Sequence, residues 1–137
     1  MSDIGEIQAL LARQRLVGDA QDEDGTRSCW ARDSTLEVVL NGKQITKRQC
    51  REEVVGFAVD VWRSGGHRKE GQIYLHFDGP ADIVLTGEGT ARSHSRALQV
   101  STLPGKFEII GIGDYQDELV HEDGAWRLLH RVVRLTK

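Results

Sequence analysis

The 137-residue sequence has few of the residues that staple or interrupt small folds, with two cysteines and two prolines. Cys29 and Cys50 form no CxxC pair and no zinc spacing, which favours reduced thiols in a cytoplasmic protein. No apolar run approaches the roughly 20 residues of a membrane span. The start, MSDIGEIQ, lacks the basic and apolar parts of a signal peptide, so none is expected.

An excess of one charge is also missing, since 18 Lys and Arg stand against 21 Asp and Glu, for a net charge of -3. This balance argues against nucleic-acid binding. The five histidines lack HExxH and HxH spacing, so no metal site is expected. Phosphate loops, a GxSxG elbow and a cysteine beside a histidine are absent too, which predicts chemistry without a cofactor.

The composition suits a single domain over residues 1–137, with 39% hydrophobic and 28% charged residues, as in ordinary soluble globular proteins. Helical patterns precede strand patterns, which predicts the α+β class. The first helix is expected over Asp3–Asp19, capped by Asp3, and a short second helix near residues 25–30. The third is expected to begin after Thr46 on a capping box and to end at residues 64–66. Its apolar stripe comprises Val54, Val55, Ala58, Val61 and Trp62.

Turn signals divide the rest of the chain into strands. Asn41-Gly42 marks a tight turn after a short alternating segment. Gly111 and Gly113 lie inside a strand pattern and predict a bulge or strong bend. Later strands are expected at 73–77, 83–85, 90–103, 107–122 and 125–135. The last three would form an antiparallel meander, and a curved antiparallel sheet around the helices would enclose an apolar pocket for a small molecule.

The last hairpin carries a distinctive pattern. Tyr115 and Asp117 occupy one strand, Asp123-Gly124 forms the turn, and Trp126-Arg127 with Arg131 follows. This pattern resembles the terminal hairpin of SnoaL-like families in the nuclear transport factor two-like superfamily. The resemblance implies a cone-shaped barrel of three N-terminal helices packed in a curved sheet, and a homodimer formed through an outer sheet face.

The N-terminal half resembles the same families in order and spacing, with Ile7-Gln8 near the start and Trp30 before the first strand. One subset uses an aspartate–histidine pair. Asp19 stands where that subset places its aspartate, and His76 lies in a stretch similar to His-x-x-Asn-Pro, with Asp78 near the expected asparagine. The resemblance implies that His76 abstracts a proton while Asp19 fixes its tautomer and stabilises the imidazolium.

Each of these residues also has a structural interpretation. Asp19 is otherwise a helix-end carboxylate in a solvated acidic run, and His76 a strand histidine bonded to a backbone carbonyl. Alternation places His76 opposite Leu75 and Phe77, on a face that is either solvent or pocket. The side chains expected to contact a ligand are Tyr74, Tyr115, Trp30, Ser93 and Arg131. The two tyrosines are phenol donors or packing aromatics, and Arg131 either reaches the ligand or pairs with a carboxylate such as Asp117.

The other histidines have separate expectations. His67 lies in a glycine-rich surface loop, His94 on the outward face of a strand, and His121 in a hairpin tip. His130 either lines the pocket or is a partly buried structural residue.

The resulting hypothesis is a cofactor-free lyase or isomerase. It would use Asp19 and His76 for dehydration, elimination or a double-bond shift of a small cyclic, polyketide-like or steroid-like substrate. One alternative is a non-catalytic domain that binds a small apolar or amphipathic ligand or a partner, as in dioxygenase small subunits. The other is an epoxide hydrolase, which needs an Asp–Arg–Asp arrangement with Arg96 or Arg131 facing the pocket.

Overall fold

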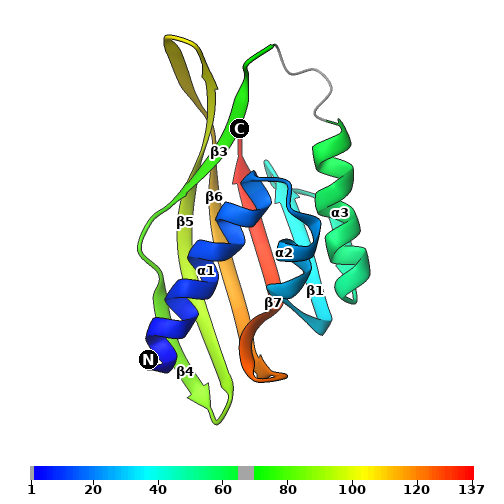
Figure 1. Ribbon diagram of the computed structural model, residues 1–137, viewed down its shortest axis with the longest axis vertical. Helices are drawn as coiled ribbons and strands as arrows, with labels where there is room; N and C mark the ends of the chain where they lie inside the picture. Colours follow the sequence, from blue (N-terminus) through cyan, green and yellow to red (C-terminus); the bar gives the residue numbers. More distant parts are fainter. Residues whose placement is uncertain (1, 65–69) are drawn as a thin grey trace.

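The computed structural model describes residues 2–64 and 70–137, as helices on one side of a long curved sheet (Figure 1). The α+β class is confirmed. The position predicted for His67 lies outside the described residues. The elements are α1 (Asp3–Asp19), α2 (Glu23–Ser28), β1 (Trp30–Leu40), β2 (Lys43–Gln49), α3 (Arg51–Ser64), β3 (Ile73–Asp78), β4 (Asp82–Gly87), β5 (Thr90–Leu103), β6 (Lys106–Glu122) and β7 (Ala125–Thr136).

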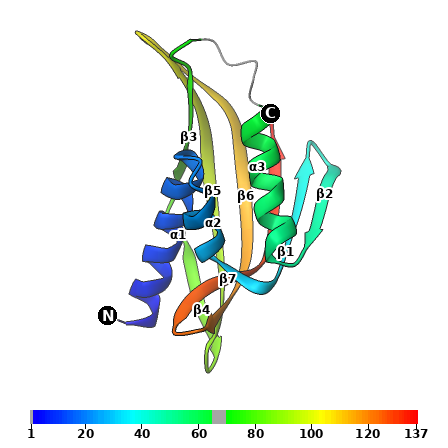
Figure 2. The same cartoon turned by 45° about the vertical axis from the view of Figure 1, so that its right-hand side comes forward.

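The sheet has seven strands in the order β2-β1-β7-β6-β5-β3, and β4 also pairs with β5. Strands β5, β6 and β7 form the predicted antiparallel meander. Strand β1 runs parallel to β7, so the sheet is mixed, and the expectation of an antiparallel sheet throughout is wrong at this pair. Parallel neighbours need a long connection, which the chain from β2 to β6 provides. The order begins at β2 and ends at β3, so the sheet curves without closing (Figure 2).

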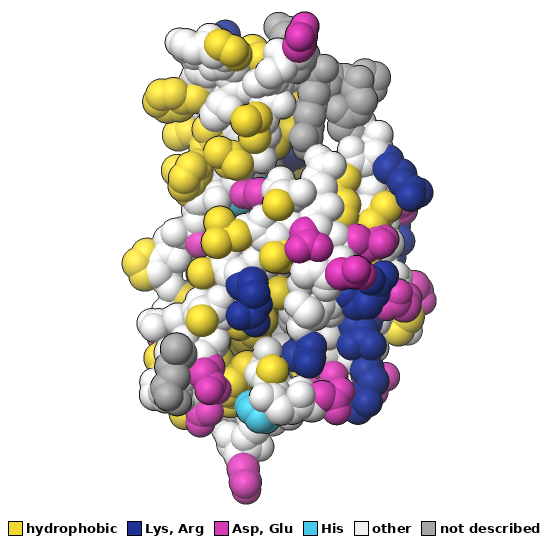
Figure 3. All heavy atoms as spheres, in the orientation of Figure 1, with side chains coloured by type: hydrophobic (Ala, Val, Ile, Leu, Met, Phe, Trp, Pro, Cys, Tyr) yellow, Lys and Arg dark blue, Asp and Glu magenta, His cyan; other side chains and the backbone are white. Residues whose placement is uncertain are grey.

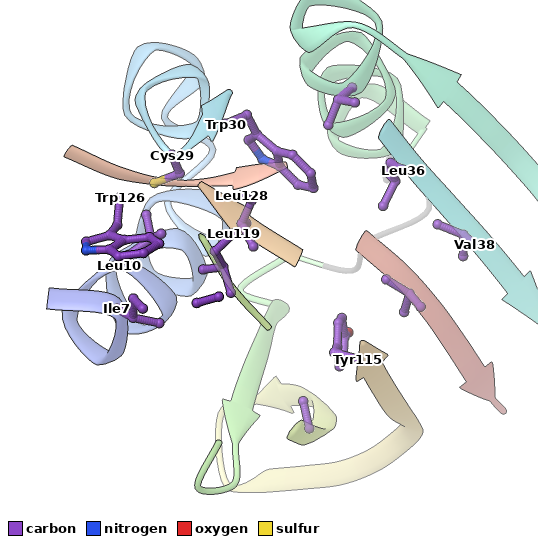
Figure 4. Close-up of a cluster of buried hydrophobic side chains, with 14 residues drawn as sticks. Ile7, Leu10, Cys29, Trp30, Leu36, Val38, Tyr115, Leu119, Trp126 and Leu128 are labelled. Atoms are coloured by element: carbon purple, nitrogen blue, oxygen red, sulfur yellow. The ribbon is translucent and has the colours of Figure 1, made fainter. Parts of the chain in front are cut away.

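The helices cover the concave face of this sheet. Helix α1 packs against β3, β4 and β7, and α3 packs against β1 and β2. Ile7 and Leu10 of α1 are almost fully buried with Leu119 of β6 and Leu128 of β7 (Figure 4). Full burial of such a side chain stabilises the fold by about 1.5–3 kcal/mol. This cluster therefore fixes α1 on the sheet. No described helix is long and apolar enough to cross a membrane.

Two helix starts differ from the sequence prediction. Ser2, and not Asp3, caps α1, because the Ser2 hydroxyl accepts the Gly5 N–H at 3.1 Å. The Asp3 carboxylate instead accepts the Trp126 indole N–H at 3.1 Å, which ties α1 to β7. Helix α2 begins at Glu23, earlier than expected, because Asp22 caps it by accepting the Gly25 N–H at 2.9 Å.

The third helix begins at Arg51, so the start expected after Thr46 is wrong. The tight turn at Asn41-Gly42 leads into β2, which pairs with β1. Thr46, which was expected to cap the helix, lies within this strand. Cys50, with a φ of 67°, separates this strand from α3. Cross-strand pairing thus replaces a local capping pattern. Cys50 is exposed, Cys29 is buried, and both are free thiols.

The predicted bulge lies beside Gly111. The pairing of β5 with β6 shifts register between Gln99 and Val100, and Gln99 lies directly opposite Gly111. A Cβ atom at Gly111 would stand 2.8 Å from Gln99 Oε1. The glycine therefore leaves space for the Gln99 carboxamide on the concave face.

Candidate active site

Asp19 and His76 meet where the end of α1 crosses β3. The His76 Nδ1–H donates to Asp19 Oδ1 at 2.7 Å, and the His76 backbone N–H donates to Asp19 Oδ2 at 2.9 Å. An ionised carboxylate only accepts, so the ring proton is assigned to Nδ1 and Nε2 keeps its lone pair. The side chains are 27% and 14% exposed for His76 and Asp19, so water reaches the pair only in part.

A second contact fixes the crossing of α1 over β3. Arg15 Nε lies 3.0 Å from both carboxylate oxygens of Asp78. Arg15 and Asp19 are four residues apart on a helix, which spans about 6 Å. His76 and Asp78 are two residues apart on a strand, which spans about 6.6 Å. This match lets both pairs form at once and sets the rotation of α1 that presents Asp19 to His76.

Gln99 of β5 completes the surroundings of the His76 ring. It is paired with His76 in the β3–β5 register, and its Nε2 lies 3.2 Å from His76 Nε2. Gln99 Oε1 is buried and has no hydrogen-bond partner among the described residues. The sequence analysis did not identify this residue, although alternation along the strand places Gln99 on the same face as Ser93, which was expected to contact a ligand.

A cavity of about 290 Å³ lies between the helices and the concave face of the sheet. Asp19, His76 and Gln99 stand in its wall. Among the residues predicted to contact a ligand, Trp30, Tyr115 and Arg131 also line it. Its apolar wall includes Leu36, Val38, Phe57, Val61, Trp62 and Val133. Small apolar molecules suit a space of this kind.

Two of the predicted ligand contacts lie elsewhere. Tyr74 is outside this cavity, in an adjoining hollow that shares Asp19, His76 and Gln99 with it. Ser93 is buried, and its hydroxyl donates to Asp117 Oδ2 at 3.4 Å. Ser93 is therefore part of the support beneath Arg131, outside the cavity wall, because it lies farther along β5.

Arg131 forms a buried bidentate pair with Asp117. Its Nε and Nη2 lie 2.7 and 3.0 Å from the two carboxylate oxygens, and its Nη1 donates to Gln14 Oε1 at 2.9 Å. Burial alone would lower the pKa of Arg131, but attraction to Asp117 and hydrogen bonds outweigh it and raise the pKa. The guanidinium lies 5.1 Å from the Tyr115 ring centre, and that of Arg15 lies 4.2 Å from it. A lasting positive charge thus stands beside Tyr115 in the cavity.

His94 and His130 lie away from this cavity. His94 is on the outer face, where its Nε2 is 2.7 Å from Asp114 Oδ1, and Arg96 joins the same carboxylate. The hydrogen bond from His94 lowers the pKa of Asp114. His130 Nδ1 lies 2.7 Å from the Thr35 hydroxyl, on the outer groove and not in the cavity wall. An irregularity in the β6–β7 register before this point turns His130 outward.

Within the described residues, no cluster of three or more His, Cys, Asp or Glu side chains has the arrangement of a metal site.

The model of the SnoaL-like domain matches residues 1–132. No curated protein matches the chain. A variant of Rv3472, a function-unknown protein from Mycobacterium tuberculosis, is 26% identical, over 97% of this chain and 71% of that chain, with a TM-score of 0.77.

Two further solved structures share the fold at lower identity. An NTF2-like protein with a cystatin-like fold from Novosphingobium aromaticivorans is 20% identical, over 97% of this chain and 81% of that chain, with a TM-score of 0.76. The beta subunit of benzoate 1,2-dioxygenase from Burkholderia mallei is 12% identical, over 98% of this chain and 91% of that chain, with a TM-score of 0.79. Both likenesses concern the fold alone.

Proposed function

The chain belongs to the SnoaL-like family, and we propose that it is a small-molecule lyase or isomerase with His76 as its base. The observation that carries this proposal is the 2.7 Å bond between His76 and Asp19 in the wall of an apolar cavity. Proteins that share one fold serve many different functions, so the proposal rests on the site and not on the fold.

The first step would be the transfer of a proton from the substrate to the unprotonated Nε2 of His76. The electron pair of the broken bond then either expels a leaving group or moves onto a neighbouring carbonyl oxygen. Asp19 would stabilise the imidazolium through Nδ1–H, because both its oxygens already hold His76. A positioned base of this kind contributes about 10²–10⁴-fold to the rate.

Another part of the cavity wall suits the oxygen that gains charge. Tyr115 lines the cavity, and the Arg131 and Arg15 guanidinium groups both lie against its ring. Positive charge near a phenol favours hydrogen-bond donation to a developing oxyanion. Because the cavity is about 290 Å³, the substrate would be a small, mostly apolar molecule with one oxygen placed toward Tyr115.

The test compares two histidine–aspartate pairs that have the same nitrogen–oxygen distance. Asp19→Asn and His76→Gln are each expected to reduce turnover at least 100-fold, in a screen of small cyclic ketones, alcohols and polyketide-like compounds. His94→Gln and Asp114→Asn change the outer pair, which has the same 2.7 Å separation, and are expected to keep turnover within twofold. Full activity in both Asp19→Asn and His76→Gln would overturn the proposal.

A partner-binding role is the second candidate, because the outer face of the sheet exposes an apolar row. Phe77, Leu98 and Ile112 are paired across β3, β5 and β6, and are 56%, 38% and 52% exposed. Figure 3, seen from the side of the helices, shows further apolar side chains at the upper end of the molecule, over β3 and the β5–β6 hairpin, while the row itself lies on the opposite face. We propose that a second copy of the chain covers the row, which is the homodimer that the family resemblance implies.

An epoxide hydrolase receives less support. Arg96 lies on the outer face beside Asp114, and Arg131 reaches the cavity but engages both oxygens of Asp117. Both oxygens of Asp117 are thus held by Arg131, and Asp117 does not line the cavity.

A further inference from the structure

We infer that Gln99 is the positioning residue of His76. In this inference, which rests on the proposed function, the Gln99 carboxamide holds Nε2 while the ring is neutral. The single lone pair of Nε2 cannot hold both an amide N–H and the substrate proton, so the carboxamide releases it as the proton arrives and turns over to accept Nε2–H.

The neutral state follows from the hydrogen bonds around the ring. Asp19 takes the Nδ1 proton, so Nε2 has only a lone pair to offer. Gln99 Nε2 is 3.2 Å away, within reach of donating an N–H to that lone pair. This bond keeps the ring turned so that Nε2 stands in the cavity wall that the substrate would face.

The other end of the same carboxamide is unpartnered. Gln99 Oε1 is buried and accepts no hydrogen bond from the described residues. Buried acceptors normally have partners, so an exception calls for a physical reason. The carboxamide has donors on one side and an acceptor on the other, and turning it by 180° exchanges them at almost the same positions.

The protonated state supplies that reason. When Nε2 receives the substrate proton, it becomes a donor and faces the amide N–H group, donor against donor. Turning the carboxamide places Oε1 on Nε2–H, in a hydrogen bond from a charged group, which is stronger than the bond it replaces. Gln99 therefore favours the imidazolium over the neutral ring, and His76 becomes a better acceptor of the substrate proton.

Gly111 makes room for the carboxamide. It lies opposite Gln99 on β6, and an added Cβ would stand 2.8 Å from Gln99 Oε1. Gly111→Ala therefore displaces the carboxamide without removing it.

Other charged and titratable groups share the cavity wall with His76. They are Arg15 and Asp19 of α1, Tyr115 of β6, Arg131 of β7 and Lys137. All of them are kept in Gly111→Ala and in the Gln99 variants.

The experiment follows the His76 ring nitrogens by long-range ¹H–¹⁵N NMR of the full chain across pH, without substrate. Gln99→Leu is expected to lower the proton affinity of Nε2 about tenfold, and Gly111→Ala is expected to lower it in the same direction. Gln99→Glu, which offers a carboxylate, is expected to raise it. Gln116→Leu on the outer face is the matched control and is expected to leave it unchanged. If Gln99→Leu and Gly111→Ala both titrate like the parent chain, the inference is wrong.

Turnover separates this result from a failure of the proposed function. Gln99→Leu is expected to reduce kcat while changing KM less. Its pH–rate profile is expected to shift in the same direction as the NMR titration of His76. A normal titration in Gln99→Leu together with loss of turnover in His76→Gln would reject the role of Gln99 and keep the base. A shifted titration in Gln99→Leu together with full turnover in His76→Gln would keep the contact and reject His76 as the base.

Discussion

Asp117 is a buried carboxylate that depends on one guanidinium. Its side chain is fully buried, and Arg131, at 5% exposure, supplies its charge partner. Removing one member of such a pair leaves the other charge uncompensated in a poorly solvated site, at a cost of about 3–5 kcal/mol. We therefore expect Asp117→Asn to lower the free energy of unfolding by that amount, measured by urea denaturation.

A surface pair provides the comparison for this loss. Asp123 lies 3.5 Å from Arg32, and both side chains are more than half exposed. Asp123→Asn is expected to change the free energy of unfolding by less than about 0.5 kcal/mol. Equal losses in Asp117→Asn and Asp123→Asn would contradict the structural importance given to the buried pair.

The sequence could identify some of these residues and not others. Asp19 and His76 were found through the resemblance to the SnoaL-like families, and Asp117 was named as an example of a carboxylate that would pair with Arg131. Gln99 was missed. Alternation along β5 was enough to place it on the concave face, but its contact with His76 depends on the β3–β5 register. Register between strands that are distant in sequence is set by the whole sheet, so no local pattern reveals it.

At the scale of elements, the ion pair between Arg15 and Asp78 holds α1 against β3. The side chains are 12% and 26% exposed, so the pair is only partly screened by water. Asp78→Asn is expected to cost about 1 kcal/mol of stability and to reduce turnover several-fold, because α1 then presents Asp19 to His76 less firmly.

Rescue distinguishes this loosening of α1 from a general loss of stability. Asp78→Glu, which retains a carboxylate for Arg15, is expected to recover most of the turnover in assays below the melting temperature. If Asp78→Asn keeps the turnover of the parent chain, the ion pair has no part in presenting Asp19.

Strands β5 and β6 carry a pair whose strength depends on pH. The hydrogen bond from His94 lowers the pKa of Asp114 below its ordinary value. A carboxylate with a lowered folded pKa stabilises the fold above its unfolded pKa, near 3.9, and loses that contribution as the pH falls through the folded value. Since the side chains of His94 and Asp114 are 45% and 29% exposed, water screens the pair, and we expect Asp114→Asn to cost only about 0.5–1 kcal/mol near pH 6.

The pH dependence is checked by urea denaturation of the parent chain and Asp114→Asn at pH 6, 4 and 3. The difference between their unfolding free energies should shrink as the pH falls below about 4. A difference that is constant over this range would mean that the Asp114 charge does not stabilise the fold.

Element boundaries were predicted best where one local signal acted alone. The bounds of α1 and β5 followed from apolar periodicity and from turns. At Thr46 a capping pattern competed with the tight turn at Asn41-Gly42, and pairing of β2 with β1 decided the outcome. Ser2 was likewise overlooked as a cap beside Asp3, because the sequence does not show that Trp126 engages the Asp3 carboxylate.

For the whole molecule, the parallel pairing of β1 with β7 could not be read from the chain. The hairpins of β5, β6 and β7 follow from turns between neighbouring segments. The β1–β7 pair instead joins the two halves of the protein and depends on how α1 and α3 fill the concave face. This pairing also brings Trp30 and Arg131, from opposite ends of the chain, into one cavity wall.

The outer apolar row leads to a prediction about how the protein assembles. Phe77, Leu98 and Ile112 form a continuous exposed strip across three strands, and exposed apolar surfaces of this kind mark contacts between proteins. A second copy of the chain would remove the row from water. We therefore expect light scattering to give the mass of a dimer for the parent chain and of a monomer for Leu98→Asp, with Arg92→Asp, on the same face but away from the row, still dimeric.

The outcomes separate the two roles considered for this protein. A dimer that persists in Leu98→Asp would place the interface elsewhere. A monomeric parent chain that captures a different protein, and loses it in Leu98→Asp, would favour a partner subunit over a self-contained enzyme. Because Leu98 points away from the cavity while its neighbour Gln99 stands in the wall, Leu98→Asp should leave the His76 ring nitrogens unchanged in the NMR titration, so assembly and chemistry can be judged separately.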